Sequence, residues 1–214
     1  MNLSDLSVKA FLDELASGSP APGGGSTAAL AGAVGAALCA MVARLTLGRE
    51  KLRDAWPAME DAAAEADHLR SRFLLLVDED ADAYLAVAAA RKLPKGTEEE
   101  RGARSRALEC AVLRSARVPL ETLLLAGQAV ALAARVLELG NPACMTDAGA
   151  AVQAARLAAE AAAYNVKINL PDIADAAERA RLAREAETAL AAVRSEADRL
   201  AGIVEARLGG PWTR

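Results

Sequence analysis

Apolar residues recur every three to four positions along most of the chain, which is the spacing of one face of an α-helix. No segment shows the strict alternation of apolar and polar residues that predicts a half-buried β-strand. Gly and Pro residues separate the periodic segments. The pattern predicts helices over the following ranges: 5–16, 26–46, 55–91, 97–140, 146–166 and 171–208.

Local signals mark the ends of several of these helices. Thr97 and Glu100 have the spacing of a capping box, and Pro57 lies in a first turn, where proline is tolerated. Pro119 lies inside the fourth range, so we expect it to kink or divide that helix, giving about six or seven helices. Because no linker or internal repeat interrupts the chain, residues 1–214 are predicted to form a single-domain helical bundle.

The composition favours the same all-α fold class. Hydrophobic residues make up 53% of the chain but aromatic residues only 3%, and alanine is the dominant residue. Alanine is the best helix former, and a core of small side chains lets helix axes approach closely. The net charge of −4 argues against a general nucleic-acid binder, whose affinity depends on Lys and Arg. It leaves open a local basic pocket for a small anion.

Residues 20–43 carry no charge, and this segment is long enough to span a bilayer. Its residues are mostly Gly and Ala, however, whereas a helix exposed to lipid would be bulky and apolar on all sides. The segment therefore predicts a buried helix of a soluble protein with no membrane partner. Its large apolar side chains form a single stripe, made of Leu30, Val34, Leu38, Met41 or Val42, and Leu45.

The cysteines and the N-terminus favour a cytoplasmic protein. Cys39, Cys110 and Cys144 are odd in number and far apart, which suits a reducing compartment and does not match a metal-site spacing. Residues 1–15 mix charged and apolar side chains and lack the pattern of a signal peptide. His68 is the only histidine and has no motif around it, so we expect it to lie on the surface.

The first candidate for chemistry is the run Gly23, Gly24, Gly25 and Ser26 at a predicted helix start. Glycines at that place can expose backbone N–H groups, and a helix N-terminus favours a negative group. The run could therefore cradle an anion or a ring carbonyl. Alternatively, it is a tight turn that lets two helices touch. Since no strand precedes it, it matches neither a Walker loop nor a Rossmann turn.

The second candidate is Asp80, which lies in the middle of an apolar helix face. At 100° per residue this face also carries Phe73, Leu76, Val77, Tyr84 and Val87. A carboxylate on a buried face is costly unless it is paired or functional. Two interpretations stay open: a catalytic carboxylate, or a structural ion pair with an arginine from another helix.

The third candidate is a group of polar residues on the fifth predicted helix. Asp147 and Asn165 share one face but lie about 27 Å apart along an ideal helix axis, so they cannot contact one reacting atom. They could bind opposite ends of a long ligand or serve neighbouring sites in an oligomer. Alternatively, Asp147 is an N-cap and Asn165 a C-terminal cap. Lys167 and Asn169 follow in the same segment.

Three segments together resemble one family, in order along most of the chain: SVKAFLDELASGSPAPGGGSTAALAGAVGAAL, VDEDADAYLAVAAARKLPKGTEEE and GNPACMTDAGAAVQAARLAAEAAAYNVKINL. They are similar to the cyclodeaminase part of formiminotransferase-cyclodeaminase and to stand-alone methenyltetrahydrofolate cyclohydrolases. PAPGGGS before an alanine-rich helix and NVKIN are the most specific pieces. CMTD departs from the more usual serine-rich wording before the aspartate, and the formiminotransferase domain has no counterpart here.

The resemblance implies an all-α fold, a homodimer and a folate site between helices, with a tetrahydrofolate derivative as substrate and no metal or redox cofactor. Asp80 is expected to shuttle the proton, and Asp147 to be the second carboxylate or an orienting group. The remaining motif positions are expected to bind substrate. They are Gly23, Gly24, Gly25 and Ser26 for the pterin, Lys92 and Lys167 for the glutamate tail, and Asn165 and Asn169.

The expected reaction is hydrolysis of 5,10-methenyltetrahydrofolate to 10-formyltetrahydrofolate, since a lone domain would lack the transferase that supplies a formimino substrate. The formimidoyltetrahydrofolate cyclodeaminase reaction is the alternative. A non-catalytic helical dimerisation module is a third possibility. A ligand-sized pocket at the glycine turn, faced by Asp80, would favour an enzyme over that module.

Overall fold

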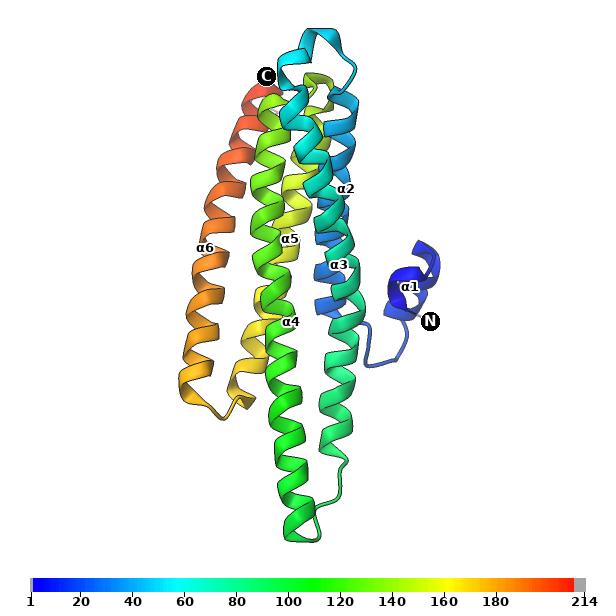
Figure 1. Cartoon of the computed structure of the whole chain (residues 1–214), viewed down its shortest axis with the longest axis vertical. Helices are drawn as coiled ribbons and strands as arrows, with labels where there is room; N and C mark the ends of the chain where they lie inside the picture. Colours follow the sequence, from blue (N-terminus) through cyan, green and yellow to red (C-terminus); the bar gives the residue numbers. More distant parts are fainter. Residues whose placement is uncertain (1, 210–214) are drawn as a thin grey trace.

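The computed structural model describes residues 2–209, and within them the chain forms six α-helices and no strand, as predicted for an all-α protein (Figure 1). Short 3₁₀ turns lie at the helix junctions. The α-helices are α1 (Val8–Leu15), α2 (Gly24–Thr46), α3 (Trp56–Arg91), α4 (Glu98–Leu139), α5 (Met145–Asn169) and α6 (Ala176–Arg207).

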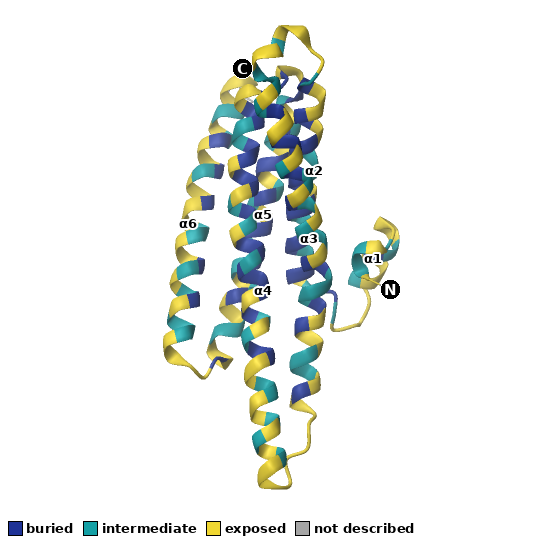
Figure 2. Cartoon of the chain, viewed as in Figure 1, coloured by how far each residue is buried: buried dark blue, intermediate teal, exposed yellow. Residues whose placement is uncertain are grey.

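Helices α2 to α6 run along the long axis of the molecule, and α1 lies beside them (Figure 1). α2, α3, α4 and α5 pack around the core, and α6 covers α4 and α5. The buried side chains face the inside of this bundle (Figure 2). At one end α3 and α4 project beyond the first turn of α2, so that the N-terminus of α2 abuts the middle of α3 (Figure 1).

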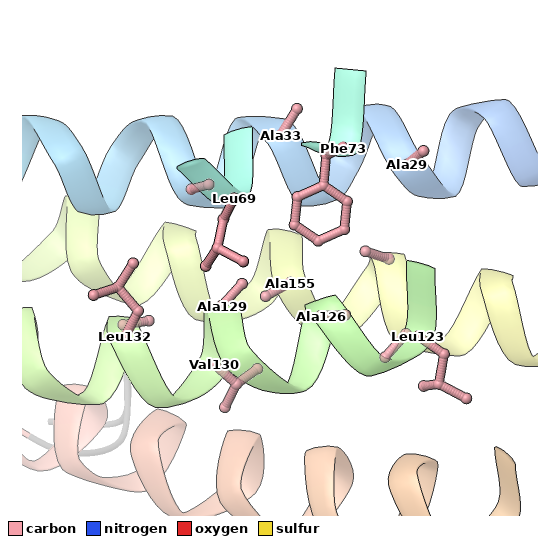
Figure 3. Packing of buried hydrophobic residues seen from close by; sticks show 14 of the residues in the cluster. Ala29, Ala33, Leu69, Phe73, Leu123, Ala126, Ala129, Val130, Leu132 and Ala155 are labelled. Atoms are coloured by element: carbon pink, nitrogen blue, oxygen red, sulfur yellow. The ribbon is translucent and has the colours of Figure 1, made fainter. Parts of the chain in front are cut away.

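Small residues line the buried face of α2, and this allows α3 to approach it closely. Phe73 and Leu69 of α3 point into the core beside Ala29 and Ala33 of α2 (Figure 3). A Cβ placed on Gly32 would overlap the Phe73 ring, so glycine provides the space for the only large aromatic side chain at this contact.

The large apolar residues of α2 lie on its other side. The sequence predicted a buried helix, and most of α2 is indeed buried, but Val34, Met41 and Leu45 are exposed on its outer face. The buried face is instead composed mainly of Gly and Ala because it meets two helices at short range. By length and hydropathy α2 and α4 could each cross a membrane, although 56% of the most apolar window of each is buried inside the bundle.

Several predicted helix boundaries need correction. α1 begins only at Val8, because Ser7 is extended and its side chain accepts a hydrogen bond from the backbone N–H of Ala10. The last helix begins at Ala176 rather than at Pro171-Asp172. The capping box of Thr97 and Glu100 is confirmed.

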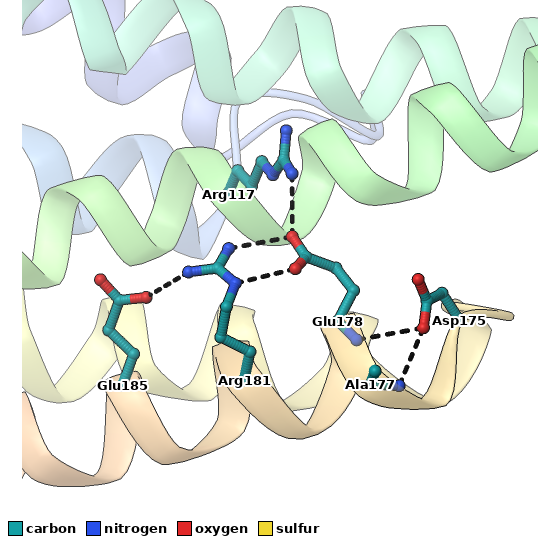
Figure 4. A network of polar contacts seen from close by, with 6 residues as sticks. All are labelled: Arg117, Asp175, Ala177, Glu178, Arg181 and Glu185. Atoms are coloured by element: carbon teal, nitrogen blue, oxygen red, sulfur yellow. Dashed lines mark hydrogen bonds and ion pairs between the residues drawn. The ribbon is translucent and has the colours of Figure 1, made fainter.

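A polar network fixes the start of α6 against α4 (Figure 4). Asp175 accepts hydrogen bonds from the first N–H groups of α6, and Glu178 binds Arg181 and, from α4, Arg117. Side-chain hydrogen bonds from Arg181 and then Arg117 lower the pKa of Glu178 to about 2. Because Asp175 accepts hydrogen bonds from these N–H groups, it is the N-cap of α6, and the ion pairs of Glu178 hold this end of α6 against α4.

Pro119 does not divide α4, which is a single helix from Glu98 to Leu139. Because proline has no N–H, the carbonyl four residues earlier, that of Ser115, loses its helical donor. The Asn169 side chain of α5 supplies a replacement, since its Nδ2 donates to the Ser115 oxygen at 2.8 Å. The backbone hydrogen bond that Pro119 removes is thus replaced by a hydrogen bond between α4 and α5.

We predict that Gly32→Ala lowers the free energy of unfolding by about 1–3 kcal/mol, because the added methyl overlaps the buried Phe73 ring. Urea denaturation measures the change. The matched control is Gly202→Ala in α6, where an added Cβ meets nothing within 4 Å, and it should raise stability by about 0.4–1 kcal/mol. Equal effects of the two substitutions would contradict this packing.

Candidate active site

A pocket of about 360 Å³ lies where the N-terminus of α2 meets α3, α4 and the end of α5. Its size is within the range of small-molecule sites. The turn before α2 and the first turn of α2 contribute Gly23, Gly24 and Gly25, and α3 contributes Asp80. An α-helix leaves its first N–H groups without intrahelical acceptors, so this end of the pocket suits a group that accepts hydrogen bonds.

Asp80 lies against the first turn of α2. A Cβ on Gly25 would overlap the Asp80 carboxylate, so only glycine at that position lets α3 bring this side chain so close. Ser26 follows directly and donates from its hydroxyl to Asp80 Oδ2 at 3.0 Å. The sequence left two interpretations of the glycine turn open, and both apply. The turn permits a tight contact between two helices, and it also lines a pocket.

The surroundings of Ser26 favour a protonated Asp80. The fully buried Ser26 hydroxyl lies 3.0 Å from the Val77 carbonyl and 3.0 Å from Asp80 Oδ2, and it has one hydrogen to give. When Asp80 is ionised, two acceptors compete for that hydrogen. When Asp80 is protonated, its O–H can donate to Ser26, which then donates to Val77, and every group is satisfied.

Burial has the same effect and raises the pKa of the Asp80 carboxyl, while hydrogen bonds from the side chain and backbone of Ser26 oppose the rise in part. The alternative of an ion pair does not hold, because none of the ion pairs among residues 2–209 includes Asp80. A carboxyl group whose pKa is raised toward the working pH is better suited to take up and release a proton than an ordinary aspartate.

Asn165 and Asn169 of α5 also line the pocket. Asn165 lies beside the glycine turn, and a Cβ on Gly24 would be 3.4 Å from its Nδ2. Its Nδ2 donates to Ala161, which leaves one N–H and the amide oxygen for a ligand. Asn169 uses its Nδ2 on Ser115 and on the Asn165 carbonyl, so it offers a ligand only its amide oxygen.

Four of the predicted site residues lie outside the lining of this pocket. Ser26 is buried behind Asp80 and holds that side chain rather than contacting a ligand. Lys92 is exposed at the C-cap of α3, and Lys167 lies in a separate groove between α5 and α6. Asp147 lies in the first turn of α5, a long way from the pocket at the other end of that helix.

The capping alternatives for the α5 residues are wrong. Cys144 is the N-cap of α5, and Asp147 lies within the first turn. The helix continues past Asn165 to Asn169, with Leu170 as the C-cap, so Asn165 is an interior residue whose side chain faces the pocket. The helix ended later than predicted because Asn169 makes side-chain bonds that hold its last turn.

Several pocket residues were not predicted as site residues, among them Tyr84, Val87 and Arg91 of α3. Tyr84 and Val87 were assigned only to the apolar face, and Arg91 was passed over in favour of its neighbour Lys92. A signal was available, because these residues follow Asp80 at intervals of four, three and four and so lie on its helix face. Within residues 2–209 no three His, Cys, Asp or Glu side chains are grouped to hold a metal ion.

A half-buried carboxyl group beside a helix N-terminus, in a pocket between bundled helices, is the arrangement of an all-α enzyme site for a small ligand. The chain belongs to the formiminotransferase-cyclodeaminase family, whose model matches residues 7–188. This confirms the family that the sequence predicted.

His68 is exposed, also as predicted.

Three similar proteins support membership of this family. A methenyltetrahydrofolate cyclohydrolase of Methylorubrum extorquens is 34% identical over 94% of this chain and 97% of its own length. The formimidoyltransferase-cyclodeaminase of Rattus norvegicus is 34% identical over 96% of this chain, which spans only 38% of that protein. The crystal structure of formiminotetrahydrofolate cyclodeaminase from Thermotoga maritima superposes with a TM-score of 0.86 at 27% identity, covering 96% of this chain and 99% of that one.

We predict that Asp80→Asn stabilises the protein at neutral pH. The pKa of Asp80 is raised in the folded state, so the stability it contributes is present at low pH and is lost as the pH rises through the folded-state pKa. The amide removes this loss and can still donate to Ser26. Thermal melts should show a higher Tm than wild type at pH 7, and no gain below the ordinary aspartate pKa of about 3.9.

The control for this comparison is Asp82→Asn, which changes an exposed carboxylate on the same helix. A lower Tm for Asp80→Asn at pH 7, relative to wild type, would mean that the ionised carboxylate is well accommodated.

Proposed function

We propose that this protein is a one-carbon folate enzyme that hydrolyses 5,10-methenyltetrahydrofolate to 10-formyltetrahydrofolate. The observation that carries the proposal is the protonatable Asp80 at the glycine end of a ligand-sized pocket. The cyclohydrolase relative supports this reaction, because the match covers nearly the whole length of both proteins. The same pocket, faced by Asp80, disfavours the alternative of a non-catalytic dimerisation module.

In the proposed reaction the ionised form of Asp80 reacts, and it acts first as a base. Water attacks the methenyl carbon, which lies between N5 and N10 of the folate, and Asp80 accepts the proton that the water loses. The tetrahedral carbon then forms its carbonyl as the bond to N5 breaks. Asp80 returns its proton to N5, and the hydroxyl proton leaves to solvent. The first N–H groups of α2 and the amide of Asn165 are expected to hold the polar edge of the pterin, because both line the pocket beside Asp80.

The cyclodeaminase reaction uses the same centre and is the second candidate. There N10 attacks a formimino carbon on N5 and ammonia leaves, which again requires a proton to move at a tetrahedral carbon. The likeness to the Thermotoga maritima cyclodeaminase supports it. One carboxyl group that accepts and then donates a proton would serve either reaction.

Mixing the purified protein with 5,10-methenyltetrahydrofolate tests the proposal, with loss of the near-ultraviolet absorbance followed against the uncatalysed rate. We expect clear acceleration, a loss of about 10²–10⁴-fold in kcat for Asp80→Asn, and little change for Asp82→Asn. Folate binding by Asp80→Asn should be largely intact. Acceleration only with the formimino substrate would select the cyclodeaminase, and unchanged turnover of Asp80→Asn would remove Asp80 from the mechanism.

We also propose that the protein acts in the cytoplasm as a homodimer, without a membrane or nucleic-acid partner. All three cysteines are free thiols, and the net charge is negative. Support for the dimer comes from the outer face of α2 and α5, which we call the α2/α5 face. It is formed by α2 residues Leu30, Val34, Leu38, Met41 and Leu45 and by α5 residues Ala150, Ala154, Leu157, Ala161 and Ile168.

The α2/α5 face has the character of a helix seam. On each helix its residues are spaced by threes and fours, apart from the seven-residue interval before Ile168, as in helices that pack side by side. The two helices are also close neighbours, since a Cβ on Gly35 would lie 3.1 Å from the Ala151 carbonyl. A second copy would bury this face about a two-fold axis.

Such an axis, perpendicular to α5, would bring the Asp147 end of one chain next to the Asn165 end of the other. We therefore propose that Asp147 of one chain supplies the second carboxylate to the pocket of the other chain in the dimer. A single chain holds the two residues at opposite ends of α5.

We predict a mass of twice the 22.1 kDa chain in light scattering coupled to size exclusion. Leu157→Lys, in the middle of the α2/α5 face, should shift the protein toward monomer because it would bury an unpaired charge. Leu75→Lys is the matched control, since Leu75 is 56% exposed on α3 and Leu157 is 55% exposed. A wild-type monomer, or equal effects of the two substitutions, would contradict the proposed interface.

A further inference from the structure

Four residues of α3 form a row along the wall of the pocket. Asp80, Tyr84, Val87 and Arg91 all line it, and each lies about one helical turn beyond the one before. The row therefore extends about 16 Å along the helix axis. Along it the chemistry changes from a carboxyl group through an aromatic and an aliphatic side chain to a guanidinium.

At its far end the row reaches the ion pair of Arg91 and Asp172. Arg91 Nη2 lies 3.0 Å from Asp172 Oδ2, and both side chains are more than half exposed. Arg104 lies beside them, because its Nη2 donates to the Arg91 carbonyl at 3.3 Å. Arg91 therefore presents its guanidinium at this end of the pocket, paired with a carboxylate that is itself more than half exposed.

The pair of Arg91 and Asp172 is poorly placed to be purely structural. An ion pair between two half-exposed side chains adds little stability, so a ligand carboxylate can replace Asp172 at small cost. The planar guanidinium can bind a carboxylate through two parallel N–H groups, which a lysine ammonium cannot do. Lys92, the neighbouring cation, is exposed and lies outside the pocket lining.

The order of groups along the row matches the order of groups in a tetrahydrofolate. The one-carbon unit lies between the pterin and N10, an aminobenzoyl ring follows, and the glutamate carboxylates come last. With the one-carbon unit at Asp80, the ring lies along Tyr84 and Val87, which offer an aromatic and an apolar surface. The carboxylates then reach the Arg91 end.

We propose that Arg91 binds a carboxylate of the glutamate tail in place of Asp172, and that it thereby sets the direction in which the folate lies along α3. This inference rests on the proposed folate substrate. It replaces Lys92 and Lys167 as the tail-binding residues with one that lines the same pocket as Asp80.

Two substrates with the same reacting centre test the proposal: 5,10-methenyltetrahydrofolate and 5,10-methenyltetrahydropteroate, which lacks the glutamate. For Arg91→Ala we expect KM to rise about tenfold with the folate and less than about twofold with the pteroate, with kcat little changed. Arg91→Lys should recover part of the loss. Lys92→Ala, as the matched control, should leave both KM values unchanged.

Equal effects of Arg91→Ala on the two substrates would overturn the proposal, and so would a folate-specific loss in Lys92→Ala. Calorimetry with tetrahydrofolate and tetrahydropteroate makes the same comparison without turnover. If the wild-type protein binds the folate more tightly through Arg91 yet accelerates neither reaction, the proposed catalytic function fails and the tail contact stands. If Arg91→Ala weakens binding of both ligands equally, the tail contact fails by itself.

Discussion

The contact between the Asp80 carboxyl group and the first turn of α2 is the constraint on which the rest of the site depends. It exists because Gly25 has no side chain to occupy that space and because Ser26 can donate to Asp80 from behind. Small residues along α2 let α3 approach closely enough to make it. The resulting burial raises the pKa of Asp80, so the same packing that places the carboxyl group also favours its protonated form.

A second coupling between packing and site runs through Pro119. The proline removes one donor from the α4 backbone, and the Ser115 carbonyl in the pocket wall is bonded instead by Asn169. Asn169 also donates to the Asn165 backbone carbonyl, so the Asn169 amide is held between α4 and its own helix. A residue that first suggests a helix break therefore has a role in positioning the site.

The hydrophobic pattern was sufficient to predict the helices, the all-α class and the unusual position of Asp80, because these depend on residues close together in sequence. It could not predict which side of α5 carries Lys167 relative to the pocket, or which end of α5, that of Asp147 or that of Asn165, lies at Asp80. Those facts depend on how helices pack, which spacing alone does not specify. Arg91 could have been predicted as a pocket residue, because it lies on the same helix face as Asp80. Its neighbour Lys92 carries the same charge and was chosen instead.

The most direct test of this account is the titration of the Asp80 carboxyl carbon by ¹³C nuclear magnetic resonance. Uniform labelling of aspartate, with the Asp80 resonance assigned by its loss in Asp80→Asn, would isolate the one group. The account predicts a midpoint above the ordinary aspartate value of about 3.9, because burial dominates over the Ser26 hydrogen bonds. A midpoint at or below that value would contradict it, since Asp80 would then be a carboxylate stabilised by the α2 N-terminus and unable to donate a proton at neutral pH.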